Sequence, residues 1–200
     1  MKKIYLDYAA TTPVDPRVLA SMMPYFSNKF ANTMSLHEMG QIAAEAIENS
    51  RKTISSFINA KAEEIYFTSS ATESNNLALK GVAFACREKE KNHIIISSIE
   101  HDCVLESSHW LTRQGFKVDE LDVDKYGFID INQLKKLINK STILVSVIHG
   151  NNEIGTIQDI AAIGKICQQK GVYFHTDASQ SLGKVEIDVE KMNIDLLTAS

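Results

Sequence analysis

The sequence predicts an α/β fold in which a mostly parallel sheet is covered by helices. Three stretches, at residues 93–98 (HIIISS), 142–147 (TILVSV) and 172–175 (VYFH), are nearly continuous apolar runs. Such runs are typical of strands that are buried on both faces of a parallel sheet. Strand and helix patterns also alternate from residue 63 onward, and this alternation favours an open α/β sheet.

Composition excludes several other classes of protein. The chain has 200 residues, of which 44% are hydrophobic and 23% charged, and this is an ordinary globular composition. The net charge of −4 gives no basic footprint for nucleic acid, and no apolar run is long enough to span a membrane. The three cysteines, widely spaced, predict neither a disulfide framework nor a zinc site. We therefore expect a cytoplasmic protein.

The N-terminal part is predicted to contain one short strand and two helices. Residues 3–8 (KIYLDY) have strand character. Asp15 and Pro16 are typical of a helix N-cap and of the first helical position. Apolar residues then recur at helical spacing over residues 35–57, which predicts a long amphipathic helix.

The remainder of the chain is predicted to alternate between strands and helices. Strands are predicted at residues 64–69, 93–98, 116–123, 142–149, 172–177 and 195–200. Helices are predicted at residues 71–89, 103–115, 130–139 and 160–171. All three prolines lie within the first 24 residues, and no linker or repeat follows them. The sequence thus predicts one domain preceded by an N-terminal segment of a different character.

Ligands of open α/β sheets bind outside the carboxyl ends of the strands, so the residues at those ends are the candidate site. Ser70 and Glu73 fit a capping box, and the helix start with the Thr72 hydroxyl is a candidate anion site. His101 follows the strand at residues 93–98. Each residue also has a purely structural interpretation, as a helix cap or as a surface histidine.

Two further strand ends carry polar groups. Asn151 and Asn152 lie with Glu153 between two glycines, a pattern that also fits a simple turn. Asp177 ends the strand at residues 172–177 and is either an N-cap or a ligand. His149 and His175 could be core histidines satisfied by hydrogen bonds, and no histidine spacing typical of a metal site is present.

Together these groups suit a phosphorylated heteroaromatic ligand. The helix start would bind phosphate, the imidazole would stack on the ring, and a carboxylate would pair with a protonated ring nitrogen. That last pairing makes a pyridine ring an electron sink. The absence of a glycine-rich dinucleotide motif and of a P-loop motif argues against nucleotide ligands.

Five segments in order along the chain resemble the cysteine desulfurases, class V members of the fold-type I enzymes that depend on pyridoxal 5′-phosphate (PLP). The segments are YLDYAATTPVDPRV, FTSSATESNNLALKG, EHDCVLES, HGNNEIGTIQDIAAIG and HTDASQSLGKVEIDV. The resemblance covers essentially the whole chain. It implies the large domain of a PLP-dependent transferase, with PLP as cofactor and L-cysteine as substrate.

The resemblance implies roles for seven residues. Ala71 and Thr72 match the family's phosphate-binding pair, and Ser200 matches a serine that helps to hold the phosphate. The remaining four match residues around the cofactor ring: the stacked histidine implicated in proton transfer, the asparagine near the ring hydroxyl and substrate, the aspartate on the pyridine nitrogen and the glutamine at the ring hydroxyl. These are His101, Asn151, Asp177 and Gln180 respectively.

The chain also departs from the family pattern. Thr33 and Met34 replace a proline and a serine, Ser70 stands where glycine is usual, and Gly150 stands where valine is usual. In the family, the Schiff-base lysine and the sulfur-accepting cysteine come after the position of Ser200. We therefore expect residues 1–200 to comprise the N-terminal segment and part of the large domain, without the rest of that domain or the small domain, and to be inactive alone.

The implied activity is conversion of L-cysteine to L-alanine, with sulfur passed to an enzyme cysteine as a persulfide. The persulfide would supply iron–sulfur cluster assembly or thiolated tRNA. The expected partners are an iron–sulfur scaffold protein or another sulfur acceptor, and a second copy of the chain in a homodimer. Three alternatives remain open: a non-catalytic scaffold, one half of a split enzyme, and a related class V enzyme such as a selenocysteine lyase or an aminotransferase.

Overall fold

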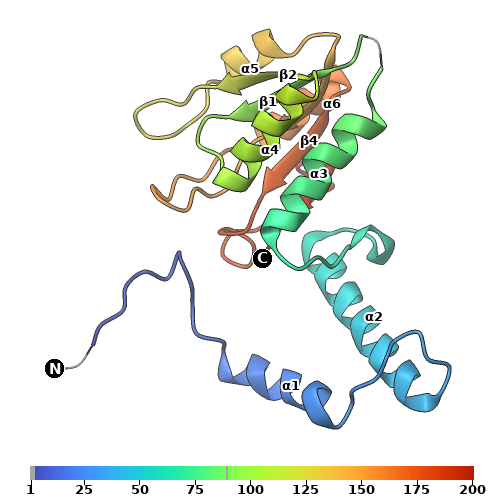
Figure 1. Ribbon diagram of the computed structural model, residues 1–200. Coiled ribbons are helices and arrows are strands. Elements are labelled where there is room, and N and C mark those ends of the chain that lie inside the picture. The colour runs from blue at the N-terminus through green and yellow to red at the C-terminus, as the bar shows by residue number, and fades with distance from the viewer. Residues whose placement is uncertain (1–2, 89) are drawn as a thin grey trace. The chain divides into compact units, whose positions relative to one another are not determined.

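The computed structural model describes residues 3–88 and 90–200 of the chain (Figure 1). The chain divides into two compact units, the first reaching to Tyr66 and the second spanning residues 67–200.

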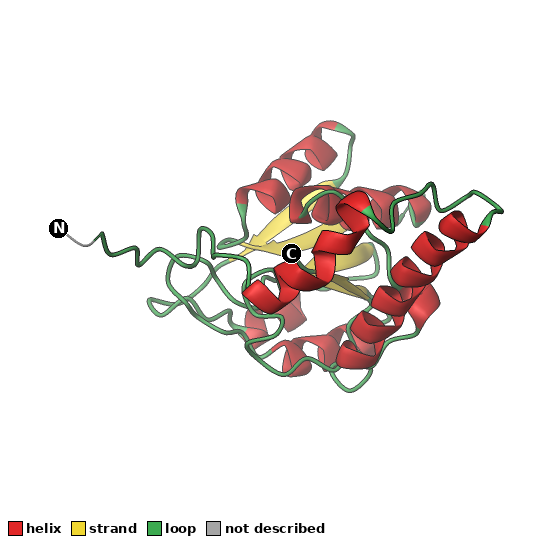
Figure 2. Ribbon diagram, turned by 90° about the horizontal axis from the view of Figure 1, so that it is seen from below, coloured by secondary structure: helices red, strands yellow, loops and turns green. Residues whose placement is uncertain are grey.

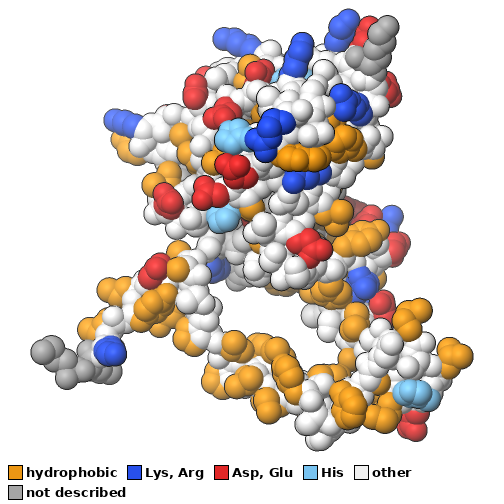
Figure 3. Space-filling view, in the orientation of Figure 1, with side chains coloured by type: hydrophobic (Ala, Val, Ile, Leu, Met, Phe, Trp, Pro, Cys, Tyr) orange, Lys and Arg blue, Asp and Glu red, His pale blue; other side chains and the backbone are white. Residues whose placement is uncertain are grey.

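Helix α1, Pro16–Ser27, begins where the sequence predicts. Pro16 is its first residue, and the Asp15 carboxylate accepts a hydrogen bond from the Arg17 backbone N–H at 2.8 Å. The helix buries none of its residues. Its exposed apolar side chains include Val18, Met23 and Phe26, and hydrophobic groups are visible along this helix in Figure 3.

Helix α2, Glu38–Ile58, confirms the predicted long amphipathic helix but begins three residues later. His37 is the N-cap, because its Nδ1 accepts a hydrogen bond from the Gly40 N–H at 3.3 Å. Asn59 ends the helix in the left-handed conformation, and the short 3₁₀ helix η1, Ala62–Glu64, follows.

Two predicted strands, at residues 3–8 and 64–69, are wrong. Neither segment forms a strand, and no described residue pairs with either one in a sheet. A strand needs a neighbour to complete its backbone hydrogen bonds, and apolar alternation cannot reveal whether that neighbour exists. The carbonyl of Ile65 is instead bonded by the Arg51 guanidinium, and Tyr66 and Phe67 are exposed.

The second unit contains a sheet in which every pair of adjacent strands is parallel, so the predicted fold class is confirmed. The order is β2-β1-β3-β4-β5. The strands are β1 (His93–Ser97), β2 (Lys117–Leu121), β3 (Thr142–Ser146), β4 (Tyr173–Asp177) and β5 (Leu196–Thr198). The helices are α3 (Ala71–Ala85), α4 (Asp102–Arg113), α5 (Ile131–Leu137) and α6 (Ile160–Lys170). The predicted end of the third helix, at Lys89, lies outside the described residues.

Helices cover both faces of this sheet (Figure 2). Successive residues of β1 point to opposite faces: Ile94 and Ile96 pack with Leu79 of α3 and Val104 of α4. Ile95 packs in a second cluster with residues of α5 and α6. Burial on both faces explains why the strands read as continuous apolar runs. No helix in the described ranges is both long and apolar enough to cross a membrane.

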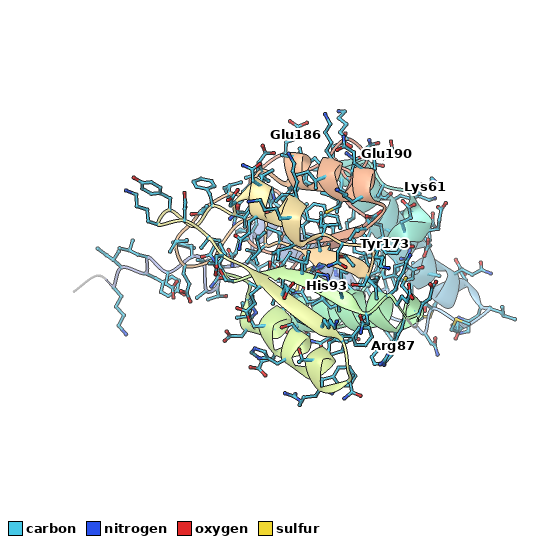
Figure 4. The ribbon with its side chains drawn as sticks, turned by 90° about the horizontal axis from the view of Figure 1, so that it is seen from above. Lys61, Arg87, His93, Tyr173, Glu186 and Glu190 are labelled. Atoms are coloured by element: carbon cyan, nitrogen blue, oxygen red, sulfur yellow. The ribbon has the colours of Figure 1, made fainter. Side chains whose placement is uncertain are left out.

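The amino ends of the parallel strands form one side of the sheet, here called the amino edge, and their carboxyl ends form the other, the carboxyl edge. The two differ in their polar groups. At the amino edge, labelled in Figure 4 by His93 and Tyr173, His93 bonds to Thr142 at 2.8 Å and to Asp119 at 3.1 Å. Burial lowers the pKa of His93, with Asp119 acting in the opposite direction. At the carboxyl edge, the strands lead into the segments that carry the predicted site.

Candidate functional site

The polar residues predicted at the strand ends come together at the carboxyl edge of the sheet. His101 follows β1, Asn151 follows β3, Asp177 is the last residue of β4, and Ser200 follows β5. These four strands are consecutive neighbours and run parallel, so the four positions share one edge. The topology therefore assembles residues that are up to 99 positions apart in the sequence, from 101 to 200.

The first turn of α3 lies at the same edge. The Thr198 hydroxyl, at the end of β5, donates to the Ser74 hydroxyl at 3.5 Å. Ser70 caps the helix by accepting the Glu73 N–H at 3.2 Å. Glu73, however, accepts from the backbone N–H and the hydroxyl of Ser69, at 2.7 and 2.6 Å. Only half of the predicted capping box forms.

Ala71 and Thr72 open this helix, and Thr72 is exposed. A helix N-terminus presents backbone N–H groups and the positive end of the helix dipole, so it favours an anion such as phosphate. The Ser69 hydroxyl lowers the pKa of Glu73, which therefore stays ionised and paired with its own loop. Thr72 carries an exposed hydroxyl at this helix start, and that hydroxyl forms a hydrogen bond with the Cys103 thiol.

Asp177 is a buried carboxylate, and only 4% of its surface is exposed. Its Oδ2 accepts a hydrogen bond from Asn75 Nδ2 at 2.7 Å, and its Oδ1 accepts from the Ser179 N–H at 2.9 Å. A turn and not a helix follows it, so the N-cap interpretation of Asp177 is wrong. Within residues 3–88 and 90–200, no cationic side chain forms an ion pair with it. A buried anion without an internal cation is suited to a cationic ligand atom.

Asn75 was missed by the sequence reasoning. It is fully buried, and its Nδ2 lies 2.7 Å from Asp177 Oδ2 and 3.2 Å from Cys103 Sγ. The available signal was its place in the helix: Asn75 shares a buried stripe with Leu79 and Ala83, at intervals of four residues. A polar residue in an apolar stripe indicates a buried hydrogen bond.

His101 caps α4 with its own ring. Its Nδ1 accepts a hydrogen bond from the Cys103 backbone N–H at 3.2 Å and lies 3.1 Å from Cys103 Sγ. Because Nδ1 accepts the backbone N–H, the proton of the neutral ring resides on Nε2. Burial raises the pKa of the Cys103 thiol, so this thiol is a neutral hydrogen-bonding group.

The remaining predicted residues complete the edge. The Asn151 Nδ2 donates to the Ile99 carbonyl at 2.9 Å, and its Oδ1 accepts from the N–H groups of Glu153 and Ile154. Asn151 thus forms the predicted turn and also fastens the segment that leads to His101. Gln180 is partly buried three residues after Asp177, and Ser200 is exposed.

His149 and His175 are core histidines satisfied by hydrogen bonds, which is what the sequence analysis allowed for them. His149 Nδ1 bonds to the Ser181 hydroxyl at 2.8 Å. His175 bonds to Ser146 at 2.9 Å and to Thr198 at 3.1 Å. Burial lowers the pKa of His149, and it lowers that of His175 to about 4. Both are neutral imidazoles that brace the strand ends.

The polar groups around Asp177 fit a pyridine phosphate. Three buried side-chain atoms among the described residues lack a hydrogen-bond partner: Asn75 Oδ1, Glu100 Oε2 and Ser179 Oγ. Asn75 and Ser179 each bond to Asp177, and Glu100 interacts with it electrostatically. The carboxyl edge therefore combines a buried carboxylate without an ion-pair partner, buried polar atoms without a hydrogen-bond partner, an exposed imidazole, and a helix N-terminus that can bind an anion.

Comparison with known proteins shows which family the chain resembles over its whole length. The model of the family "Aminotransferase class-V" matches residues 4–200. The cysteine desulfurase IscS of Dictyoglomus turgidum is 48% identical over 199 residues, which are 100% of this chain and 50% of that protein. IscS of Methanosarcina thermophila is 50% identical, with 100% and 49% covered. The chain thus spans about half the length of these relatives.

Solved structures show the same relationship. A structure described as "SspA in complex with cysteine" superposes with a TM-score of 0.94 at 46% identity, covering 98% of this chain and 56% of that one. A "NifS-like protein" also gives a TM-score of 0.94, at 39% identity, covering 98% and 55%. The family match, the identities and the shared fold all concern nearly every residue of the chain. The chain belongs to the class V aminotransferase family, and its relatives there are cysteine desulfurases.

Proposed function

We propose that these 200 residues form the ring- and phosphate-binding part of a PLP-dependent cysteine desulfurase. Such an enzyme converts L-cysteine and a protein thiol into L-alanine and a persulfide on that thiol. The proposal rests mainly on Asp177, a buried carboxylate that has no internal cation as a partner. Asn75 donates a hydrogen bond to Asp177 and also contacts Cys103, in the first turn of the helix that His101 caps. The neighbouring structure described with cysteine supports L-cysteine as the substrate.

The residues that the sequence analysis selected each have a role in this proposal. When bound, PLP supplies an electron sink, because its pyridine nitrogen is held protonated by a carboxylate. Asp177 would hold that proton, with Asn75 fixing the orientation of its carboxylate. Ala71, Thr72 and Ser200 would bind the phosphate, and Asn151 and Gln180 would bond the ring hydroxyl.

His101 is the candidate proton carrier. Its Nδ1 is engaged by the Cys103 N–H, so its Nε2 is the atom that can release or take up a proton. The helix that His101 caps fixes the ring, and a fixed imidazole is the usual general acid or base in proteins.

Turnover would require groups beyond those identified among these residues. No lysine here is assigned as the covalent anchor. Of the three cysteines, burial raises the pKa of Cys103, and it raises that of Cys167 to about 12, so neither provides a reactive thiolate. We propose that this polypeptide alone releases no alanine from cysteine. The full enzyme would act as a cytoplasmic homodimer that supplies sulfur for iron–sulfur clusters or thiolated tRNA, through a scaffold or other acceptor protein.

The binding role can be tested with 4′-deoxypyridoxine 5′-phosphate, a PLP analogue without the aldehyde. It keeps the ring nitrogen, ring hydroxyl and phosphate, but it cannot label surface lysines. Calorimetry should show binding to the unmodified chain and a loss of about tenfold or more for Asp177→Asn, the effect of losing one charge-assisted hydrogen bond. The control Asp122→Asn changes an exposed residue after β2 and should bind within about twofold of the parent.

Equal binding by all three proteins, or no binding by the parent, would overturn the proposal. A second measurement addresses the covalent anchor. Borohydride reduction of the chain with PLP, followed by mass spectrometry, should give no efficient label at a single lysine. A specific, near-complete label would show that an anchoring lysine is present after all.

A further inference from the structure

Glu100 is a buried acid at the carboxyl edge that no part of the proposed function uses. It precedes His101 and is only 6% exposed. Its Oε1 accepts two short hydrogen bonds, both at 2.6 Å, from the Ser97 hydroxyl and from the Ile148 backbone N–H. Ser97 is the last residue of β1, and Ile148 lies just beyond β3. One oxygen atom therefore ties together the ends of two adjacent strands.

This tie belongs to a larger clamp on the segment that carries His101. Asn151 Nδ2 donates to the Ile99 carbonyl at 2.9 Å, so the residues after β1 are held from the β3 side at two points. Both points, Ile99 and Glu100, lie immediately before His101, the N-cap of α4. A change at Glu100 would therefore be transmitted to His101 and Asn151, which lie at the proposed cofactor edge.

The surroundings of Glu100 favour its uncharged form. No ion-pair partner of Glu100 occurs in the part of the chain that the structure describes, and its Oε2 is buried without a hydrogen-bond partner. The titratable groups that act on it are Asp177 at the end of β4 and Cys103 in α4. Burial, reinforced by the Asp177 charge, raises the pKa of Glu100 to about 7, although the Ser97 and Ile148 hydrogen bonds oppose this.

We propose that Glu100 is a positioning residue that works as a neutral carboxylic acid, clamping the β1 and β3 ends so that His101 and Asn151 are held in place for the cofactor. A neutral Glu100 also leaves Asp177 as the single negative charge of this pair of carboxyl groups. One anion matches one protonated pyridine nitrogen, whereas two buried anions side by side would repel each other. The inference rests on the proposed function for its link to the cofactor, but the clamp itself is a property of the chain.

Glutamine separates this proposal from a role for a charged carboxylate. Glu100→Gln keeps an acceptor oxygen at the position of Oε1 but can never ionise, whereas Glu100→Ala removes the clamp. Glu120→Ala, at an exposed position in β2, is the control. We would measure the affinity of each variant for the deoxypyridoxine analogue. The NMR titration of the His101 ring and the urea midpoint would be recorded from about pH 5 to about pH 9.

The expected results follow from the neutral clamp. At about pH 5, where Glu100 of the parent is also uncharged, Glu100→Gln should match the parent in analogue affinity and in its His101 resonances. Its urea midpoint should fall less than that of the parent as the pH rises from about 5 to about 8, since the parent must ionise a buried acid over this range. Glu100→Ala should shift the His101 resonances and weaken the analogue by about fivefold or more, the effect of a lost buried hydrogen bond.

Two outcomes would overturn the proposal. One is a Glu100→Gln variant that binds the analogue as weakly as Asp177→Asn at about pH 5, and the other is a set of His101 resonances that do not shift in Glu100→Ala. Should Glu100→Ala not fold, the pH dependence of the urea midpoint still tests the proposal. If Glu100 of the folded parent were charged throughout this pH range, the midpoints of Glu100→Gln and of the parent would change with pH to the same extent. Should the parent not bind the analogue, the proposed function fails, while the His101 and stability measurements still test the clamp.

Discussion

Replacing Asn75 with alanine tests how much the hydrogen bond from Asn75 to the Asp177 carboxylate stabilises the fold. The bond between Asn75 Nδ2 and Asp177 Oδ2 is 2.7 Å long, and the two residues are 0% and 4% exposed. A hydrogen bond to a charged group contributes about 1.5–3 kcal/mol, and its loss leaves a buried carboxylate oxygen without this donor. Alanine in a helix interior recovers roughly 0.5 kcal/mol. Asn75→Ala should therefore lower the free energy of unfolding by about 1–2.5 kcal/mol.

Asn76→Ala is the matched control. Asn76 occupies the next position in the same helix. Its Nδ2 donates a hydrogen bond at 2.9 Å to the carbonyl oxygen of Thr72, which is exposed, and its Oδ1 accepts one from Lys80 Nζ. It gains the same helix propensity without disturbing Asp177, so its stability should stay within about 0.5 kcal/mol of the parent. Urea unfolding can be followed by the fluorescence of Trp110, the only tryptophan, which lies in α4 of the unit that contains the site. Identical urea midpoints for the two variants would show that the Asn75–Asp177 hydrogen bond does not stabilise the fold.

Two other predictions concern packing and pH. A Cβ on Gly164 would overlap the Met192 carbonyl oxygen, whereas one on Gly81 would meet nothing within 4 Å. Gly164→Ala should destabilise by about 1–3 kcal/mol, and Gly81→Ala should stabilise by up to about 1 kcal/mol, as urea midpoints would reveal. Equal effects would contradict the packing of α6. The pKa of His175 falls on folding from 6.5 to about 4, so the unfolded chain binds this proton first and stability declines as the pH drops through this window. His175→Gln should flatten that decline, and an unchanged slope would argue against a buried neutral His175.

The sequence predicted the second unit well because its elements carry local signals. The apolar runs of β1, β3 and β4 mark strands buried on both faces, and Asp130 and Asp159 cap α5 and α6 as polar residues before apolar helices. The strands predicted at residues 3–8 and 64–69 failed, since a strand also depends on a partner that local alternation does not encode.

Sequence reasoning anticipated which polar residues lie together at the carboxyl edge, but it did not anticipate the buried residues that hold them in place. His101, Asn151 and Asp177 were found because strand ends of a parallel sheet share one edge. Asn75 and Glu100 were missed because their partners are distant: Asn75 bonds to a residue 102 positions away, and Glu100 to one 48 positions away. Only the fold brings these partners into contact. The position of Glu100 next to His101 in the sequence does not indicate which strand end its carboxyl group will bond.

We propose that the carboxyl edge of this sheet binds the ring and the phosphate of the cofactor. An NMR map of the backbone amides during titration with the deoxypyridoxine analogue would locate the binding surface. The largest shifts should occur at Thr72, His101 and Asp177, while His93 and Tyr173 at the amino edge should stay unchanged. Shifts centred on the amino edge, or scattered evenly over the chain, would contradict this proposal.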